Sequence, residues 1–240
     1  IRDVERSRGL GDVYKRQVLQ VLKEVDEVTN DIETLLNKNK IWLDRTKGIG
    51  IISKDDAFSY GISGPLARAA GIDWDLREKE PYSSYEDFDF DVVIALNGDV
   101  FDRYLVRMEE IRQSVKICRE VLEKMPPGEV NVDPDLGFSL PPKDEVYNSI
   151  EGLIYHFEVT MPNRGMTPPV GEAYVPTESP NGELGFYIVS DGTRTPYRVR
   201  TRPPSFINYS IFSKLAEGHM LSDVPAILGS FNIIAGELDR

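Results

Sequence analysis

Arginines and aspartates gather in glycine-containing, loop-like stretches of the first third of the chain. Arg45, Arg68 and Arg77 lie in such sequence, with Asp44, Asp73 and Asp75 nearby. A guanidinium group binds a carboxylate through two parallel hydrogen bonds, so arginine is the usual residue of buried or interfacial ion pairs. From the residues alone, ordinary ion pairing at the surface is the favoured interpretation, with structural or interfacial ion pairs as the alternative.

Residues that bind metals or act as nucleophiles are few. His156 and His219 are the only imidazoles, and no carboxylates or cysteines stand at ligand spacing beside them, so the sequence predicts no metal site. The single cysteine, Cys118, lies on an apolar helical stripe and is predicted to be a small core residue. An iron–sulfur cluster needs about four thiolates, so this chain alone holds none. The sequence identifies no catalytic residue.

The charge of the chain is strongly acidic. A net charge of −12 opposes binding to nucleic acid and direct adhesion to an anionic membrane surface. The sequence has no uninterrupted apolar run of about eighteen residues, so it predicts no segment that spans a bilayer. The length of 240 residues allows one large domain or two small ones.

Apolar residues at three- to four-residue spacing predict the helices that position these side chains. One helix is expected over residues 18–37 and a longer one, capped by Asp99, over residues 99–125. Shorter helices are expected over residues 144–158, 206–217 and 221–228. The long helix carries an apolar stripe that is predicted to pack into the core: Phe101, Tyr104, Leu105, Met108, Ile111, Val115, Cys118, Leu122 and Met125.

Three β-type runs follow the helices, over residues 173–177, 184–189 and 197–201. Asn181-Gly182 and Asp191-Gly192 stand between them as hairpin turns. The predicted class is therefore α+β, with a helix-rich core and a small antiparallel β meander.

The first residues follow a different pattern. Residues 1–17 show neither an apolar period nor a secretory core, and residues 9–17 resemble a translated sequencing adaptor. We interpret residues 1–17 as a non-native or disordered tail, and residues 18–240 as part of a single domain.

Several strings resemble the D subunit, the quinone-site subunit, of proton-pumping NADH:quinone oxidoreductase, which is respiratory complex I. The similarity runs in order from about Lys40 to Arg240. The strings that carry it are Ser63–Gly71 with Trp74–Arg77, Asp102–Glu110, Glu151–Phe157, Gly185–Gly192 and the final stretch Gly218–Arg240.

The final stretch also resembles the large subunit of nickel–iron hydrogenases, which carries two metal-binding cysteines in this segment. Aligned on Asp239-Arg240, those cysteines fall at Ile234 and Glu237, which are not thiolates. Nickel sites of this kind need thiolate ligands. The resemblance therefore implies a hydrogenase-large-subunit fold whose metal has been lost.

The resemblance implies a wall of the quinone-reduction cavity beside the terminal iron–sulfur cluster of a partner subunit. It places Asn232, Ile234 and Arg240 beside the quinone or the cluster, and makes Arg45, Arg68 and Arg77 near-cluster or structural arginines. Asn232 stands where the family usually has an acidic residue, so it has lost a charge and a proton acceptor.

The resemblance also implies partners and location. Quinone is the substrate, this chain holds no cofactor, and NADH and FMN bind elsewhere in the complex. The expected partners are other complex I subunits, especially the B and C subunits and the membrane H subunit. The expected location is peripheral, on the cytoplasmic face of the plasma membrane.

Three alternatives to the full activity follow from the same residues. The family's quinone-headgroup histidine and tyrosine come from an N-terminal region without a counterpart here, so the chain is expected to be a C-terminal fragment that is inactive alone. A related hydrogenase-like or ferredoxin-accepting membrane complex shares the ancestry. A purely structural scaffold is the third possibility.

Overall fold

The computed structural model describes residues 2–125, 140–161 and 167–239, and for residues 2–12 the backbone alone. The chain forms two compact units. The first comprises Ile1–Met125, Pro176–Leu184 and Pro203–Arg240, and the second comprises Pro126–Val175 and Gly185–Arg202. Helices together with one small sheet confirm the predicted α+β class.

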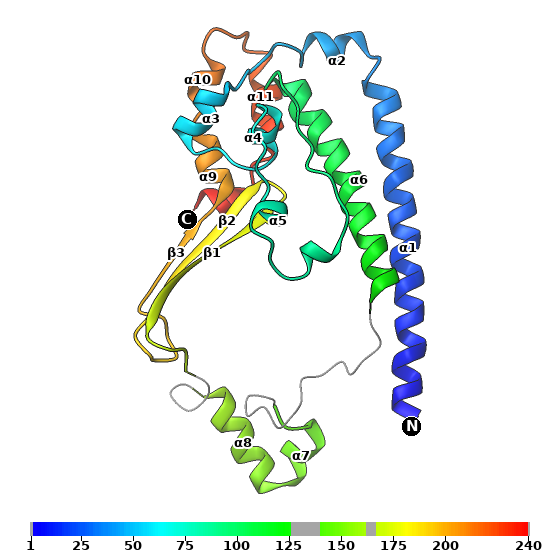
Figure 1. Cartoon of the computed structure of the whole chain (residues 1–240), viewed down its shortest axis with the longest axis vertical. Helices are drawn as coiled ribbons and strands as arrows, with labels where there is room; N and C mark the ends of the chain where they lie inside the picture. The colour runs from blue at the N-terminus through cyan, green and yellow to red at the C-terminus, as the bar shows by residue number, and fades with distance from the viewer. Residues whose placement is uncertain (1, 126–139, 162–166, 240) are drawn as a thin grey trace. The chain divides into compact units, whose positions relative to one another are not determined.

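The first unit is built mainly from helices (Figure 1). Residues 206–217, predicted as one helix, form two, because the chain turns at Ser210 and Ile211 between them. The helices of this unit are α1 (Arg2–Leu36), α2 (Lys40–Asp44), α3 (Lys54–Tyr60), α4 (Pro65–Ala69), α5 (Leu76–Lys79), the 3-10 helix η1 (Tyr85–Asp87), α6 (Val100–Lys124), α9 (Pro204–Tyr209), α10 (Phe212–Ala216), α11 (Val224–Phe231) and α12 (Ala235–Leu238).

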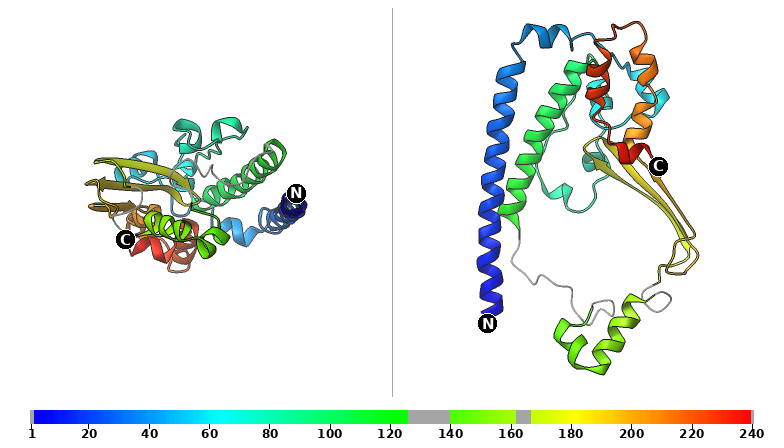
Figure 2. Two further views of the ribbon diagram at one scale, coloured as in Figure 1. Left: turned by 90° about the horizontal axis from the view of Figure 1, so that it is seen from below. Right: turned by 180° about the vertical axis from the view of Figure 1, so that it is seen from behind.

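The two long helices lie side by side, as the views in Figures 1 and 2 agree. α6 begins where predicted, because the Asp99 carboxylate accepts a hydrogen bond from the Asp102 amide at 2.8 Å. α1 begins at Arg2, whereas an unstructured tail was one expectation for residues 1–17. An ion pair between Arg119 and Asp26, at 2.5 Å, links the two helices.

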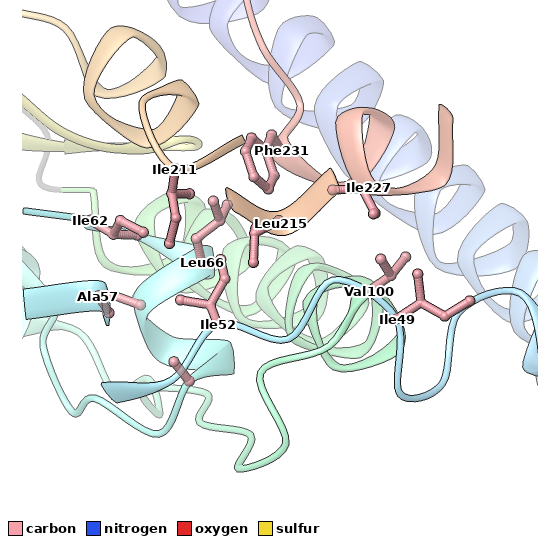
Figure 3. Close-up of a cluster of buried hydrophobic side chains, with 12 residues drawn as sticks. Ile49, Ile52, Ala57, Ile62, Leu66, Val100, Ile211, Leu215, Ile227 and Phe231 are labelled. Atoms are coloured by element: carbon pink, nitrogen blue, oxygen red, sulfur yellow. The ribbon is translucent and has the colours of Figure 1, made fainter. Parts of the chain in front are cut away.

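A cluster of buried apolar side chains forms the core of the first unit (Figure 3). It joins α3 and α4 to the start of α6 and to the C-terminal helices. Leu66, Ile211 and Ile227 are fully buried at its centre. Segments far apart in the sequence are therefore held together by the burial of apolar surface. Each Å² of apolar surface removed from water stabilises the fold by about 25 cal/mol.

The predicted stripe on α6 is only partly correct. Met108 and Val115 are buried, but Ile111 is 38% exposed and Leu105 is only half-buried. Val106, outside the stripe, is 1% exposed. The face of α6 that meets the core is rotated from the apolar stripe, because charged side chains of the helix are also buried there.

The second unit contains two helices and most of the sheet. Residues 144–158, predicted as one helix, form α7 (Lys143–Asn148) and α8 (Ile150–Thr160), because Ser149 is extended and its Oγ caps the new helix at the Gly152 amide. The strands β1 (Gly171–Ser179), β2 (Gly182–Ser190) and β3 (Arg198–Arg202) follow in that order in the sheet, close to the predicted runs. β2 and β3 are antiparallel, with Gly185 opposite Arg202.

The rotated face of α6 gives a test with neighbouring positions. Val106→Asp places an unpaired carboxylate in the core, so we expect the free energy of unfolding to fall by about 3 kcal/mol or more. Leu105→Asp, at a half-buried site, should cost less than half as much. Chemical denaturation measures both variants, and equal losses would contradict this assignment of the buried face.

Candidate functional site

The backbone before α4 and the backbone at the start of β2 approach each other closely. This contact holds α4 against the turn between β1 and β2. Gly64, with φ +68°, precedes α4, and a Cβ there would lie 2.4 Å from the Cα of Gly182. Only glycine permits both the conformation and the contact. The Oγ of Ser63 accepts a hydrogen bond from the Glu183 amide at 3.0 Å, which holds the turn in place.

Arg68 on α4 is the centre of a buried charge cluster. Its side chain is 2% exposed. Nε donates to Glu110 of α6 at 2.7 Å, and Nη1 donates to Glu178 of β1 at 2.8 Å and to the Trp74 carbonyl at 3.0 Å. The arginine thus ties α4 to α6 and to the sheet.

Asp75 extends the cluster to α5. Its carboxylate is fully buried, lies 3.6 Å from Nη1 of Arg68 and accepts hydrogen bonds from Nε and Nη2 of Arg77 at 3.0 and 2.6 Å. This is the two-bond geometry in which a guanidinium group binds a carboxylate. Ion pairs at Arg68 and Arg77 are therefore structural features of the core, not ordinary surface pairs.

The cluster shifts the pKa values of its members in different directions. Burial disfavours the charge on Arg68, but Glu110, Glu178 and Asp75 outweigh burial and raise the pKa of Arg68. Burial also opposes ionisation of Asp75, but the hydrogen bond from Arg77 and the charge of Arg68 lower its pKa. For Glu178, burial prevails and the pKa is raised.

A second, uncharged network holds the C-terminal segment against the same turn. Asn232 ends α11 with a left-handed conformation, φ 55°, and its Nδ2 donates to Oδ1 of Asn181 at 2.8 Å. The Asn181 carbonyl accepts a hydrogen bond from Nδ2 of Asn208 at 3.0 Å, and the Oδ1 of Asn208 accepts one from the Ser63 amide. This network places Asn232 beside the buried charges.

Members of the charge cluster, together with Asn232, line one cavity of about 570 Å³. Apolar side chains of α1 and α6, among them Leu22, Val25 and Val115, form part of its wall. The polar part of the wall brings together residues from five segments of the chain: Arg68, Arg77, Arg107, Glu110, Glu178 and Asn232. We name this space the arginine cavity.

The structure places the predicted site residues differently. Arg68, Arg77 and Asn232 line the arginine cavity. Arg45 is not in its lining; it pairs with the buried Asp223 at 2.7 Å. Ile234 is half-exposed and donates its amide to Ser205 at 3.4 Å. Arg240 lies outside the described residues.

Several residues of the cavity wall were not predicted. Arg107 and Glu110 lie one turn apart on α6, so they share one side of the helix, beside the apolar stripe. Their helical spacing is the sequence signal that could have identified them. Glu178 bonds to a residue 110 positions away, and no local pattern indicates such a partner. Cys118, predicted to be a core residue, is exposed and borders the cavity, because the stripe that it belongs to is only partly buried.

Metal-binding clusters and membrane-spanning helices are both absent from the described residues. No group of three or more histidine, cysteine, aspartate or glutamate side chains is placed to hold a metal ion in residues 2–125, 140–161 and 167–239. In the same part of the chain, no helix combines the length and apolar character needed to cross a membrane.

Similarity to known proteins extends over nearly the whole chain. Residues 7–240 match the family described as respiratory-chain NADH dehydrogenase, 49 Kd subunit, and this range includes most of the segment interpreted as a tail. The chain belongs to this family. It is 48% identical to the D subunit of the NADH-quinone oxidoreductase of Geotalea uraniireducens, over 98% of the chain and 59% of that protein.

Other members of the family give similar coverage of the chain. The D subunit of the enzyme of Methylacidiphilum infernorum is 51% identical, over 97% of the chain and 54% of that protein. The C/D subunit of the enzyme of Bdellovibrio bacteriovorus is 47% identical, over 93% of the chain and 40% of that protein. The chain thus spans somewhat more than half the length of the first two relatives.

The buried cluster predicts how stability depends on pH. Arg68→Met leaves Glu110, Glu178 and Asp75 without their shared cation, so the free energy of unfolding should fall by about 3–5 kcal/mol at pH 7. Without Arg68 the folded-state pKa values of Asp75 and Glu178 rise, because the charge of Arg68 lowers both. The loss in the free energy of unfolding, relative to wild type, is therefore largest at pH above those pKa values. It shrinks as the pH falls and the carboxyls take up protons.

Arg112→Met is the matched control on α6, because Arg112 pairs with Glu33 and Glu109 near the surface. It should cost at most about 1 kcal/mol. Denaturant unfolding of both variants across the acidic range measures the difference. Equal losses, or a loss at Arg68 that does not change with pH, would show that the cluster is not the dominant interaction.

Proposed function

We propose that this chain forms part of the quinone-reduction cavity of a proton-pumping NADH:quinone oxidoreductase, beside the terminal iron–sulfur cluster of a partner subunit. Membership of the 49 Kd subunit family supports the complex. The observation that carries the cavity is the convergence of Arg68, Arg77 and Asn232 on one wall.

The chemistry of the wall suits a quinone. A quinone ring has apolar faces and carbonyl oxygens that accept hydrogen bonds. Leu22, Val25 and Val115 offer apolar surface, and the guanidinium group of Arg77 offers donors. When the partner's cluster supplies electrons, reduction also needs protons. The raised pKa of Glu178 suits a carboxyl that exchanges a proton near the cavity.

We assign roles to the site residues on this basis. Asn232, Ile234 and Arg240 belong beside the quinone or the cluster, and Asn232 orients by hydrogen bonding because a carboxamide does not take up a proton at neutral pH. Arg45, Arg68 and Arg77 are near-cluster or structural arginines, and their ion pairs favour the structural role.

The rest of the assignment follows the family. The chain holds no cofactor of its own; the iron–sulfur cluster, FMN and NADH belong to other subunits. Its partners are the B, C and membrane H subunits, and its place is peripheral, on the cytoplasmic face of the plasma membrane. The name of the Bdellovibrio relative, which joins C and D in one subunit, supports contact with a C subunit. The fold is that of a hydrogenase large subunit without its metal.

A scaffold that never contacts quinone is the competing function. It is favoured by one observation: the carboxylates that face Arg68 are already engaged in ion pairs. A related ferredoxin-accepting complex differs in its electron donor, which binds outside this chain.

A photoreactive quinone analogue tests the proposal in the assembled complex with the full-length subunit. We expect labelling of the α6 segment around Arg107 and Ile111, or of the segment around Asn232, because both border the arginine cavity. Excess unlabelled quinone should abolish the labelling. Label that falls only on other subunits would favour the scaffold and overturn the proposal.

A further inference from the structure

Unsatisfied polar atoms gather on a different cavity of the first unit. Nε1 of Trp42, Oη of Tyr104 and Nε of Arg107 are enclosed and have no hydrogen-bond partner in the described part of the chain. All three side chains line a second cavity, of about 500 Å³, between α2, α6 and α11. Arg107 and Asn232 border both cavities, whereas Trp42 and Tyr104 border only this one.

The chemistry of these atoms indicates what is missing. Indole and guanidinium nitrogens are donors only, and a phenol hydroxyl donates as readily as it accepts. A buried polar group without a partner costs about 1–3 kcal/mol, and native proteins have few of them. Three such groups in one wall indicate that an acceptor is absent from the described residues.

The charge of the wall indicates that this acceptor is an anion. Arg107 lines this cavity, and Arg103 lies one turn away on α6, outside the lining; neither forms an ion pair with a described residue. Burial lowers the pKa of Arg103 to about 9 and that of Arg107 to about 10, so both stay cationic at neutral pH. Glu110, the carboxylate that favours the charge on Arg107, is bonded to Arg68.

Arg107 is only weakly held in its present position. Its two hydrogen bonds, to the carbonyls of Arg103 and Phe231, are long, at 3.4 and 3.3 Å. Charge-assisted bonds to a carboxylate are shorter and about twice as strong as neutral ones. The guanidinium group can therefore turn towards a carboxylate in the cavity at little cost.

We propose that the cavity between α2, α6 and α11 is a docking site for an acidic side chain, flanked by apolar residues, of another polypeptide segment. The carboxylate accepts hydrogen bonds from Arg107, Tyr104 and Trp42. The apolar flanks cover Val100, Met108 and Pro225 in the wall.

The share of the relatives' length that the chain matches favours a polypeptide over a small amphiphile as the occupant. The match spans 59% of the Geotalea protein, so the rest of that protein is polypeptide that this chain does not carry. Ile111, a partly exposed apolar side chain of the same wall, extends the apolar surface, which suits a broader segment.

Matched peptides test the site on the 240-residue chain. In a Trp74→Phe variant, Trp42 is the only tryptophan, so its fluorescence reports binding. The probes are two capped pentapeptides, with leucine and phenylalanine on both sides of a central glutamate or glutamine, and octanoate as a free amphiphile. We expect the glutamate peptide to bind tenfold or more tightly than the glutamine peptide, and more tightly than octanoate.

Two variants separate docking from folding. Arg107→Gln should abolish the preference for glutamate, whereas Arg112→Gln on the same helix should retain it. Tyr104→Phe removes only an unpartnered hydroxyl, so it should weaken binding severalfold without lowering the melting temperature. Equal binding of the two peptides, no binding at about 1 mM, or tighter binding of octanoate would each overturn the proposal.

Discussion

The buried positive charge of Arg68 is the constraint on which the rest of the first unit depends. A guanidinium group with 2% exposure needs acceptors around it, and those of Arg68 are mainly carboxylates that come from α6, from β1 and from the segment before α5. Because these segments are far apart in the sequence, satisfying one charge fixes the relative positions of three elements. Apolar burial around Leu66 and Ile211 supplies the bulk stabilisation, but it is non-directional and does not select this arrangement.

The arginine cavity is a consequence of that arrangement. Carboxylates turned towards Arg68 leave space between α1, α6 and the β1–β2 turn, and the asparagine network brings the end of α11 to its edge. Asn232 is held there by its left-handed conformation and by Asn181, without a charge of its own. The site therefore combines an internally paired wall with an uncharged residue at position 232. This favours orientation of a ligand over proton exchange at position 232.

Local chemistry was predictable from the sequence, and long-range pairing was not. Asp99 caps α6, and the turn between β1 and β2 includes Asn181, with Gly182 as the first residue of β2, because both signals act within a few residues. Asp75 and Arg77 are also local partners, but the sequence named only aspartates near the arginines and did not select this pair. Glu178 and Asn208 reach their partners only in the folded chain. The buried face of α6 was misplaced because arginine and aspartate side chains, normally solvent-facing, share that face with Val106.

A double-mutant cycle between Arg68 and Glu110 is the most direct measurement of the central claim. The free energies of unfolding of Arg68→Met, Glu110→Gln and the double variant give the coupling between α4 and α6. If their buried ion pair positions the two helices, the coupling energy is about 2 kcal/mol or more. A coupling near zero would show that apolar packing alone positions α6 and that the charge cluster is incidental.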